Sequence, residues 1–192
     1  MSCRCRERSQ TAMPRIVQTV FRRVYGKPAW LVRKGYGSSI TLEFGRPKLK
    51  IWKKLLKPSR KAGIKYPTRL ASVRGDWRLW IYCCHWEVRQ EGEKIGHSES
   101  SDKKVEQACS VLDGQILERV IFDSRTLRTE FHFDLGGQLR TSPYRGEPME
   151  MWSLRCPNGR YFEVSSDGTY CYCPGDTKPN EKRWLPLISD SA

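Results

Sequence analysis

Residues 74–89 read RGDWRLWIYCCHWEVR, and the rest of the chain is organised around this run. Alternate residues of a strand point to opposite faces, and a half-exposed strand is apolar on one face only. Here both alternating sets are apolar: one contains Trp77, Leu79, Ile81 and Cys83, and the other contains Trp80, Tyr82, Cys84, Trp86 and Val88. The run therefore predicts a central strand that is covered on both sides and bounded by Arg74 and Arg89.

The composition is that of a folded protein with one full-sized core. Of the 192 residues, 38% are hydrophobic, and seven Trp and eight Tyr are present, whereas disordered chains are poor in aromatic residues. We expect a single domain over residues 14–187. A loose basic leader at 1–13 precedes it, with Met13 as an alternative start, and a tail at 188–192 follows.

The charge of the chain is unevenly distributed. Residues 1–80 carry 21 Lys and Arg against three acids, whereas the remaining 112 residues carry 14 basic and 18 acidic groups. The overall net charge is +14. This asymmetry points to a basic first part that could meet a polyanion, attached to a near-neutral body. The alternative, which we favour, is that these surface cations only keep the protein soluble.

The sequence also indicates the cellular compartment in which the protein is expected. No stretch approaches the roughly 18 to 20 apolar residues of a membrane span, and the basic N-terminus lacks the apolar segment of a secretory signal. Eight cysteines in an unsecreted chain are typical of reduced thiols. We therefore expect a cytoplasmic protein without a membrane span.

Within the domain, we distinguish a basic part (14–73), the central strand (74–89), and a helix with a β-meander (101–173). Residues 14–27 fit either a short helix or an edge strand. Their apolar residues have helical spacing, but several are β-branched, which weakens the helical interpretation.

Residues 40–44 and 48–51 alternate apolar with polar side chains around Gly45-Arg46-Pro47. This pattern predicts two amphipathic strands joined by a tight connection, with one face in the core and the other cationic. Residues 50–57, KIWKKLLK, also fit a basic amphipathic helix that lies on a membrane or a partner. Eight residues are few for such a role, so we favour a solvated connection to the basic loop 57–69.

One helix is well supported, over residues 102–113. Ser101 or Asp102 is the expected N-cap, and Asp113-Gly114 ends the helix. Its apolar residues recur at helical spacing and are expected to cover one side of the Trp-rich strand: Val105, Ala108, Cys109 and Leu112.

Strands follow from residue 115 onward. Residues 115–123 and 127–134 predict a hairpin, and residues 149–173 predict three short strands separated by Asn158-Gly159 and Asp167-Gly168. The predicted fold class is therefore α+β, a mostly antiparallel β-sheet with one helix at about 102–113 packed on it.

Five segments carry a resemblance to a known group of proteins: GYGSSITLEFG, VRGDWRLWIYCCHWEV, LDGQIL, FHFDLGGQL and DGTYCYCPGDTKPNE. Over residues 28–187 the chain resembles an uncharacterised family of small bacterial proteins, and it is distantly similar to β-rich immunity-type domains of unknown function. The resemblance implies a compact bacterial cytosolic protein and carries over no catalytic residue. The basic first part departs from immunity proteins against nucleases, which tend to be acidic because they mimic nucleic acid.

One predicted strand presents candidates for catalysis or metal binding on a single face, while Phe131, Phe133 and Leu135 are expected in the core. Two carboxylates and an imidazole suit a divalent metal or an acid and base pair. Same-face neighbours are about 6 to 7 Å apart, so we favour the ordinary solvent face of an amphipathic strand. The candidates are Glu130, His132 and Asp134.

Two groups of thiols offer candidate zinc ligands. Cys171 and Cys173 share a strand face, and Cys83 and His85 belong to a second group. Neither pair has the Cys-x-x-Cys spacing of structural zinc sites, so buried free thiols are the favoured interpretation. Phosphate-binding, dinucleotide-binding and nucleophile-elbow motifs are absent from the sequence, and no cofactor is expected.

Cations interleave with aromatic rings in the first part of the chain. Lys and Arg neutralise phosphates, and rings stack on unpaired bases, although no DNA- or RNA-binding fingerprint is present. The candidate binding residues are Arg22, Arg23, Lys27, Arg33, Lys34, Lys48, Lys50, Lys53, Lys54, Lys57, Arg60 and Lys61.

These observations leave three hypotheses. The first is a non-enzymatic binding module that contacts a protein partner, in an immunity or defence setting. The second is a nucleic-acid-binding accessory protein that uses the basic N-terminal region. The third is a metal-dependent enzyme centred on Glu130, His132 and Asp134.

Overall fold

The computed structural model describes residues 13–58, 63 and 65–187; the predicted tail and all of the predicted leader except Met13 lie outside them. Within these residues the chain forms two α-helices, one short 3-10 helix and fourteen strands. In chain order they are α1 (Arg15–Phe21), β1 (Lys27–Lys34), β2 (Ile40–Phe44), β3 (Lys48–Leu56), β4 (Thr68–Arg74), β5 (Trp77–Ile81), β6 (His85–Gln90), β7 (Glu93–His97), α2 (Asp102–Leu112), β8 (Ile116–Asp123), β9 (Arg128–Phe133), β10 (Gly137–Ser142), β11 (Glu150–Arg155), β12 (Arg160–Ser165), β13 (Thr169–Pro174), η1 (Pro179–Glu181) and β14 (Leu185–Pro186).

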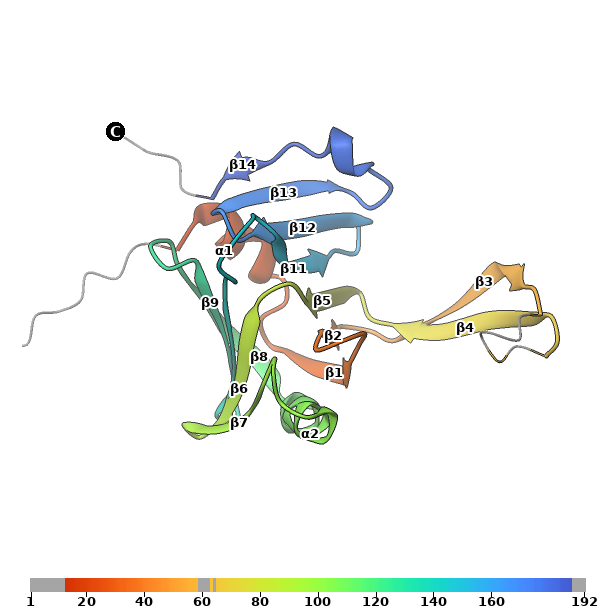
Figure 1. Ribbon diagram of the computed structural model, residues 1–192, viewed down its shortest axis with the longest axis horizontal. Helices are drawn as coiled ribbons and strands as arrows, with labels where there is room; N and C mark the ends of the chain where they lie inside the picture. The colour runs from red at the N-terminus through yellow and green to blue at the C-terminus, as the bar shows by residue number, and fades with distance from the viewer. Residues whose placement is uncertain (1–12, 59–62, 64, 188–192) are drawn as a thin grey trace, which may run out of the picture.

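Twelve of these strands form one antiparallel sheet, in the order β14-β13-β12-β11-β5-β2-β1-β8-β9-β10-β6-β7. Strands β3 and β4 pair with each other and extend away from the sheet (Figure 1). The β-rich, antiparallel α+β prediction is confirmed, with two helices instead of one. None of the described helices is both long enough and apolar enough to cross a membrane.

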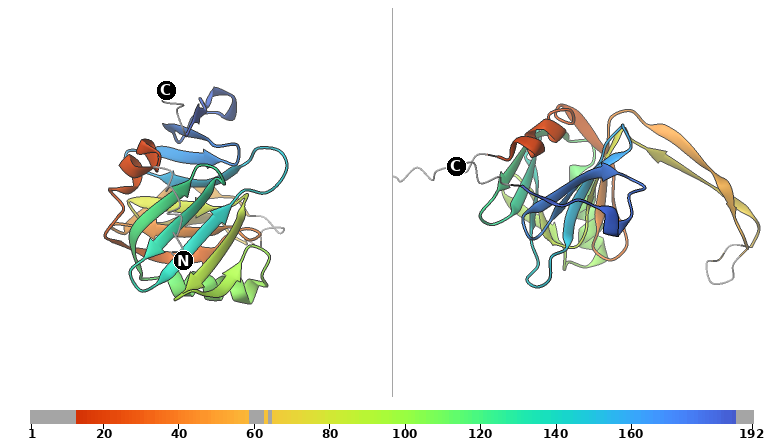
Figure 2. Two further views of the ribbon diagram at one scale, coloured as in Figure 1. Left: turned by 90° about the vertical axis from the view of Figure 1, so that its left-hand side faces the viewer. Right: turned by 90° about the horizontal axis from the view of Figure 1, so that it is seen from above.

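The sheet curves so that its two halves face each other across the core. Trp152 on β11 contacts Phe131 on β9 at a ring-centroid distance of 5.8 Å, although four strands separate β11 from β9 in the sheet. The Trp152 indole Nε1 also donates a hydrogen bond to Thr129 Oγ1 at 3.1 Å. Helix α1 covers one end of this space (Figure 2), and its Phe21 ring touches both Trp152 and Phe131.

Helix α2 has the predicted span and buried face, but it packs mainly on β1 and β7 and not on the Trp-rich run as expected. The four apolar residues expected on one face are all buried. Gly96 of β7 permits the close approach, because a Cβ atom there would lie 2.9 Å from the carbonyl oxygen of Lys104.

The Trp-rich run 74–89 is two strands, not the single central strand that was expected. Strands β5 and β6 lie at separate places in the sheet, and residues 82–84 connect them. Each strand is buried on one face only, and Trp80 on the outer face of β5 is 43% exposed. The buried residues have odd numbers before the connection (Leu79 and Ile81) and even numbers from Cys84 onward (Cys84, Trp86 and Val88). This shift by one residue explains why both alternating sets of the run are apolar.

The basic part differs from its prediction as well. Strand β2 pairs with β1 and β5, and β3 pairs with β4, so the chain continues outward at Gly45-Arg46-Pro47. Leu49 and Ile51 do not enter the core, because they are 68% and 56% exposed. The sequence KIWKKLLK is strand as far as Leu56, not a helix.

Three further predictions are settled. Helix α1 resolves the alternative for residues 14–27 in favour of a helix, which strand β1 follows. The hairpin 115–134 is confirmed as β8 and β9, and the three later strands as β11, β12 and β13. Leu135 is 64% exposed, so its predicted place in the core was wrong.

Candidate functional site

The most distinctive surface is the hairpin of β3 and β4, residues 46–74, which we call the basic ribbon. It projects from the body of the molecule in Figure 1 and in the right view of Figure 2. Its sequence contains 11 Lys and Arg and no acid, out of 35 Lys and Arg and 21 acids in the chain. The rest of the chain therefore carries 24 basic and 21 acidic groups, so most of the net charge resides on the ribbon.

The register of the ribbon gives it two different faces. Leu49 lies opposite Val73 and Ile51 opposite Ala71, so these side chains share an apolar face. Lys48 lies opposite Arg74 and Lys50 opposite Ser72, on the other face. Both faces are open to solvent near the body, because only two strands form the ribbon.

The second face combines cations with an aromatic ring. The Lys50 Nζ lies 4.4 Å from the centre of the Trp52 ring, and the Arg74 guanidinium lies 5.0 Å from it. In the part of the chain that the structure describes, neither Lys50 nor Arg74 forms an ion pair with an acid. Burial, together with the nearby Arg78 and Arg155, lowers the pKa of Arg74 from its ordinary value. The face therefore presents uncompensated positive charge around a stackable ring.

Two acids fix the base of the ribbon to the body. The Glu43 carboxylate is buried and accepts hydrogen bonds from the backbone N–H of Gly75, at 2.8 Å, and from the Arg78 guanidinium. The Asp76 carboxylate accepts the backbone N–H of Arg46 at 2.9 Å and pairs with Lys48. These hydrogen bonds lower the pKa of Asp76. Both strands of the ribbon are thus held where they leave the sheet.

The predicted basic residues divide between the ribbon and the body. Lys48, Lys50, Lys53, Lys54 and Lys57 belong to the ribbon, and Arg60 and Lys61 lie outside the described residues. The remaining candidates lie just after α1 or on β1: Arg22, Arg23, Lys27, Arg33 and Lys34.

The structure gives two of the body cations a local role and adds two ribbon residues. Lys34 pairs with Asp102 at 3.2 Å, and the Lys27 Nζ lies over the Trp77 ring. Arg69 and Arg74 of β4 were missed by the sequence analysis. The absence of any acid between Glu43 and Asp76 was the signal that would have included them.

The structure brings Glu130 and His132 together but leaves Asp134 apart. The Glu130 Oε2 and His132 Nε2 atoms are 3.1 Å apart. The Asp134 carboxylate instead accepts the backbone N–H of Ile116 at 2.7 Å, at the end of the neighbouring strand. Burial lowers the pKa of His132, and the adjacent Arg119 contributes to the same shift.

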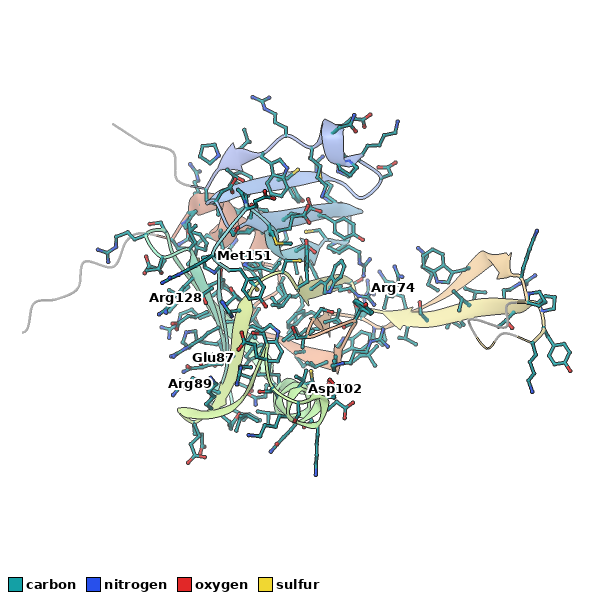
Figure 3. The ribbon with its side chains drawn as sticks, viewed as in Figure 1. Arg74, Glu87, Arg89, Asp102, Arg128 and Met151 are labelled. Carbon is teal, nitrogen blue, oxygen red and sulfur yellow. The ribbon has the colours of Figure 1, made fainter. Side chains whose placement is uncertain are left out.

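Glu130 also lines a groove of about 390 Å³ over β9, β10, β6 and β7. Its acids and bases largely satisfy one another, since Arg140 lies 3.7 Å from Glu87 and 3.6 Å from Glu130. Glu87 and Arg128, which line the groove, lie well away from the ribbon base at Arg74 (Figure 3). The groove is therefore polar and nearly charge-balanced, in contrast to the ribbon.

The predicted thiol candidates also separate. Cys171 and Cys173 lie together on β13, and Glu163 of β12 joins them within 4.8 Å, whereas Cys83 and His85 do not gather with them. No other set of three such ligands gathers elsewhere among the described residues. Burial raises the pKa of the Cys171 thiol to about 12, so the thiol is protonated at neutral pH.

Comparisons of this chain with protein-family models, curated proteins and solved structures gave no match.

Proposed function

We propose that the protein binds nucleic acid and that the basic ribbon is the contact element. The observation that carries this proposal is the separation of charge. All 11 charges of residues 46–74 are positive, and the rest of the chain is close to neutral. A projecting polycation whose counter-charge lies at its base, on Asp76, is the arrangement that a phosphate backbone complements.

The dimensions and chemistry of the ribbon support the same proposal. A two-stranded β-ribbon fits the major groove of duplex DNA, which is about 12 Å wide. On the cationic face, Lys50 and the partly buried Arg74 both lie against the Trp52 ring. This ring is 38% exposed and can stack on an unpaired base. The hydrogen bonds that Glu43 and Asp76 accept from the backbone hold the base of the ribbon in position on the body.

The proposal is tested by fluorescence anisotropy with a labelled single strand and a labelled duplex, across a salt titration. We expect log affinity to fall linearly with log salt, because each neutralised phosphate releases counterions. The double variant Lys50→Gln/Arg74→Gln is expected to bind about tenfold more weakly and to reduce the salt slope by about two.

The matched control removes the same charge from the body. Arg23→Gln/Arg33→Gln changes two exposed cations outside the ribbon and is expected to keep both affinity and slope close to those of the wild type. Absence of binding at low salt, or an equal loss in both double variants, would contradict the proposal.

Contact with a protein partner is the second candidate, and the apolar face of the ribbon favours it. Leu49, Ile51 and Val73 are all exposed there, and exposed apolar patches often mark protein interfaces. The salt titration separates the two candidates, since apolar contacts depend weakly on salt. The enzymatic hypothesis and the relation to immunity-type domains stay predictions.

A further inference from the structure

Three metal-binding side chains meet on strands β12 and β13. Glu163 is paired in register with Cys171, and Cys173 follows on the same face of β13. Phe162 and Val164, the neighbours of Glu163, enter the core from the opposite face. The two sulfurs and one carboxylate oxygen all lie within 4.8 Å of one another, and all three side chains are buried.

These separations are close to those of a tetrahedral zinc site. Zinc lies about 2.3 Å from thiolate sulfur and about 2.0 to 2.2 Å from carboxylate oxygen, so its ligand atoms are about 3.5 to 3.8 Å apart. The three atoms therefore need to approach one another by about 1.3 Å at most. Thiolate ligands favour zinc over magnesium or calcium, which prefer oxygen ligands alone.

A partly buried lysine, Lys182, lies beside the cluster. The Lys182 Nζ lies 2.7 Å from Glu163 Oε2 and 2.8 Å from Glu150 Oε1. Lys182 approaches the Oε2 atom of Glu163, and a carboxylate can accept two cations because it has two oxygens. Two thiolates and the Glu163 carboxylate would carry three negative charges, and a divalent ion together with Lys182 would balance them.

We propose that Cys171, Cys173 and Glu163 bind one zinc ion, with water as the fourth ligand and Lys182 as the neighbouring counter-charge. Binding forms two zinc–sulfur bonds and one zinc–oxygen bond and releases the two thiol protons to solvent. Glu163 lies beside the two thiols, whereas the other sequence candidates for this ligand set, Cys83 and His85, do not. The sequence shows the two thiols, but only the pairing of β12 with β13 brings the carboxylate to them.

The test uses the full chain and the metal alone. We expect about one zinc per chain by mass spectrometric metal analysis of the reconstituted protein. Substitution with Co²⁺ is expected to give thiolate-to-cobalt charge-transfer absorption, a signature that carboxylate and imidazole ligands do not produce. Cys173→Ser and Glu163→Gln are each expected to weaken zinc binding, the thiol variant by more than about 100-fold.

Cys109→Ser is the matched control, because Cys109 is a buried thiol on α2 outside the cluster. It is expected to retain both the zinc and the cobalt absorption. The cobalt spectrum of the wild type decides the proposal even where a thiol variant fails to fold. Its absence, or equal zinc binding by the wild type and the Cys173→Ser variant, would overturn the proposal.

Discussion

The body and the basic ribbon differ in how their aromatic side chains are buried and how their charged side chains are paired. In the body, Trp152 is fully buried against Phe21, Phe131 and Phe162, and most charged groups of the groove are paired. In the ribbon, Trp52 stands among cations and the apolar residues are open to solvent. The body is stabilised by its own interior, whereas the ribbon leaves cations and apolar side chains open to solvent.

The largest expected effect compares the two tryptophans. Trp152→Ala removes the ring that joins the two halves of the sheet and should lower the free energy of unfolding by about 3 to 5 kcal/mol. Trp52→Ala removes a ring that contacts ribbon cations and should change it by less than about 0.5 kcal/mol. Urea unfolding followed by far-ultraviolet circular dichroism measures both.

The milder variant Trp152→Phe keeps most of the ring volume and provides a folded comparison if Trp152→Ala does not fold. A loss of stability in Trp52→Ala as large as that in Trp152→Ala would mean that the ribbon is part of the folding core. The contrast between the two regions would then be wrong.

An intermediate effect is expected at the junction. Glu43→Gln weakens the charged hydrogen bonds to Gly75 and Arg78 and should cost about 1.5 to 3 kcal/mol in the free energy of unfolding. The matched change Asp102→Asn removes an exposed acid that pairs with Lys34 and should cost less than about 1 kcal/mol. Equal losses in urea unfolding would show that the junction is not a special anchor.

The sequence predicted correctly those elements whose pattern depends only on residues of the element itself. The spacing of Val105, Ala108, Cys109 and Leu112 identified α2, and glycine turns identified the strands of the second half. The prediction of one central strand over the Trp-rich run was wrong. Which side chains of this run face the core depends on where the chain passes from one half of the sheet to the other. Residues 82–84 shift the buried positions by one, and alternation alone does not reveal such a shift.

The candidate sites show the same division. The charge of the ribbon was visible in the sequence, but its projection was not, because amphipathic alternation in Leu49 and Ile51 is typical of a strand that covers a core. Glu130 and His132 were found because they are neighbours on one strand. Glu163 was missed because its place beside Cys171 depends on the pairing of β12 with β13.

The smallest expected effect is a pH dependence confined to the body. His132 faces Glu130 on its own strand, Arg119 on β8 and Arg140 on β10, and its pKa is lowered chiefly by burial from the ordinary value of 6.5. The unfolded chain therefore binds the proton more readily, so this contribution to stability is complete above about pH 6.5 and declines as the pH falls through the interval below it.

We expect His132→Gln to flatten the dependence of the urea midpoint on pH between about pH 7 and about pH 5. The control His85→Gln, at an exposed side chain, should preserve that dependence. Residues 46–74 contain no histidine or carboxylate, so nucleic-acid binding at constant salt should change little over the same interval. A midpoint in His132→Gln that still follows the wild-type pH curve would assign the dependence to another group.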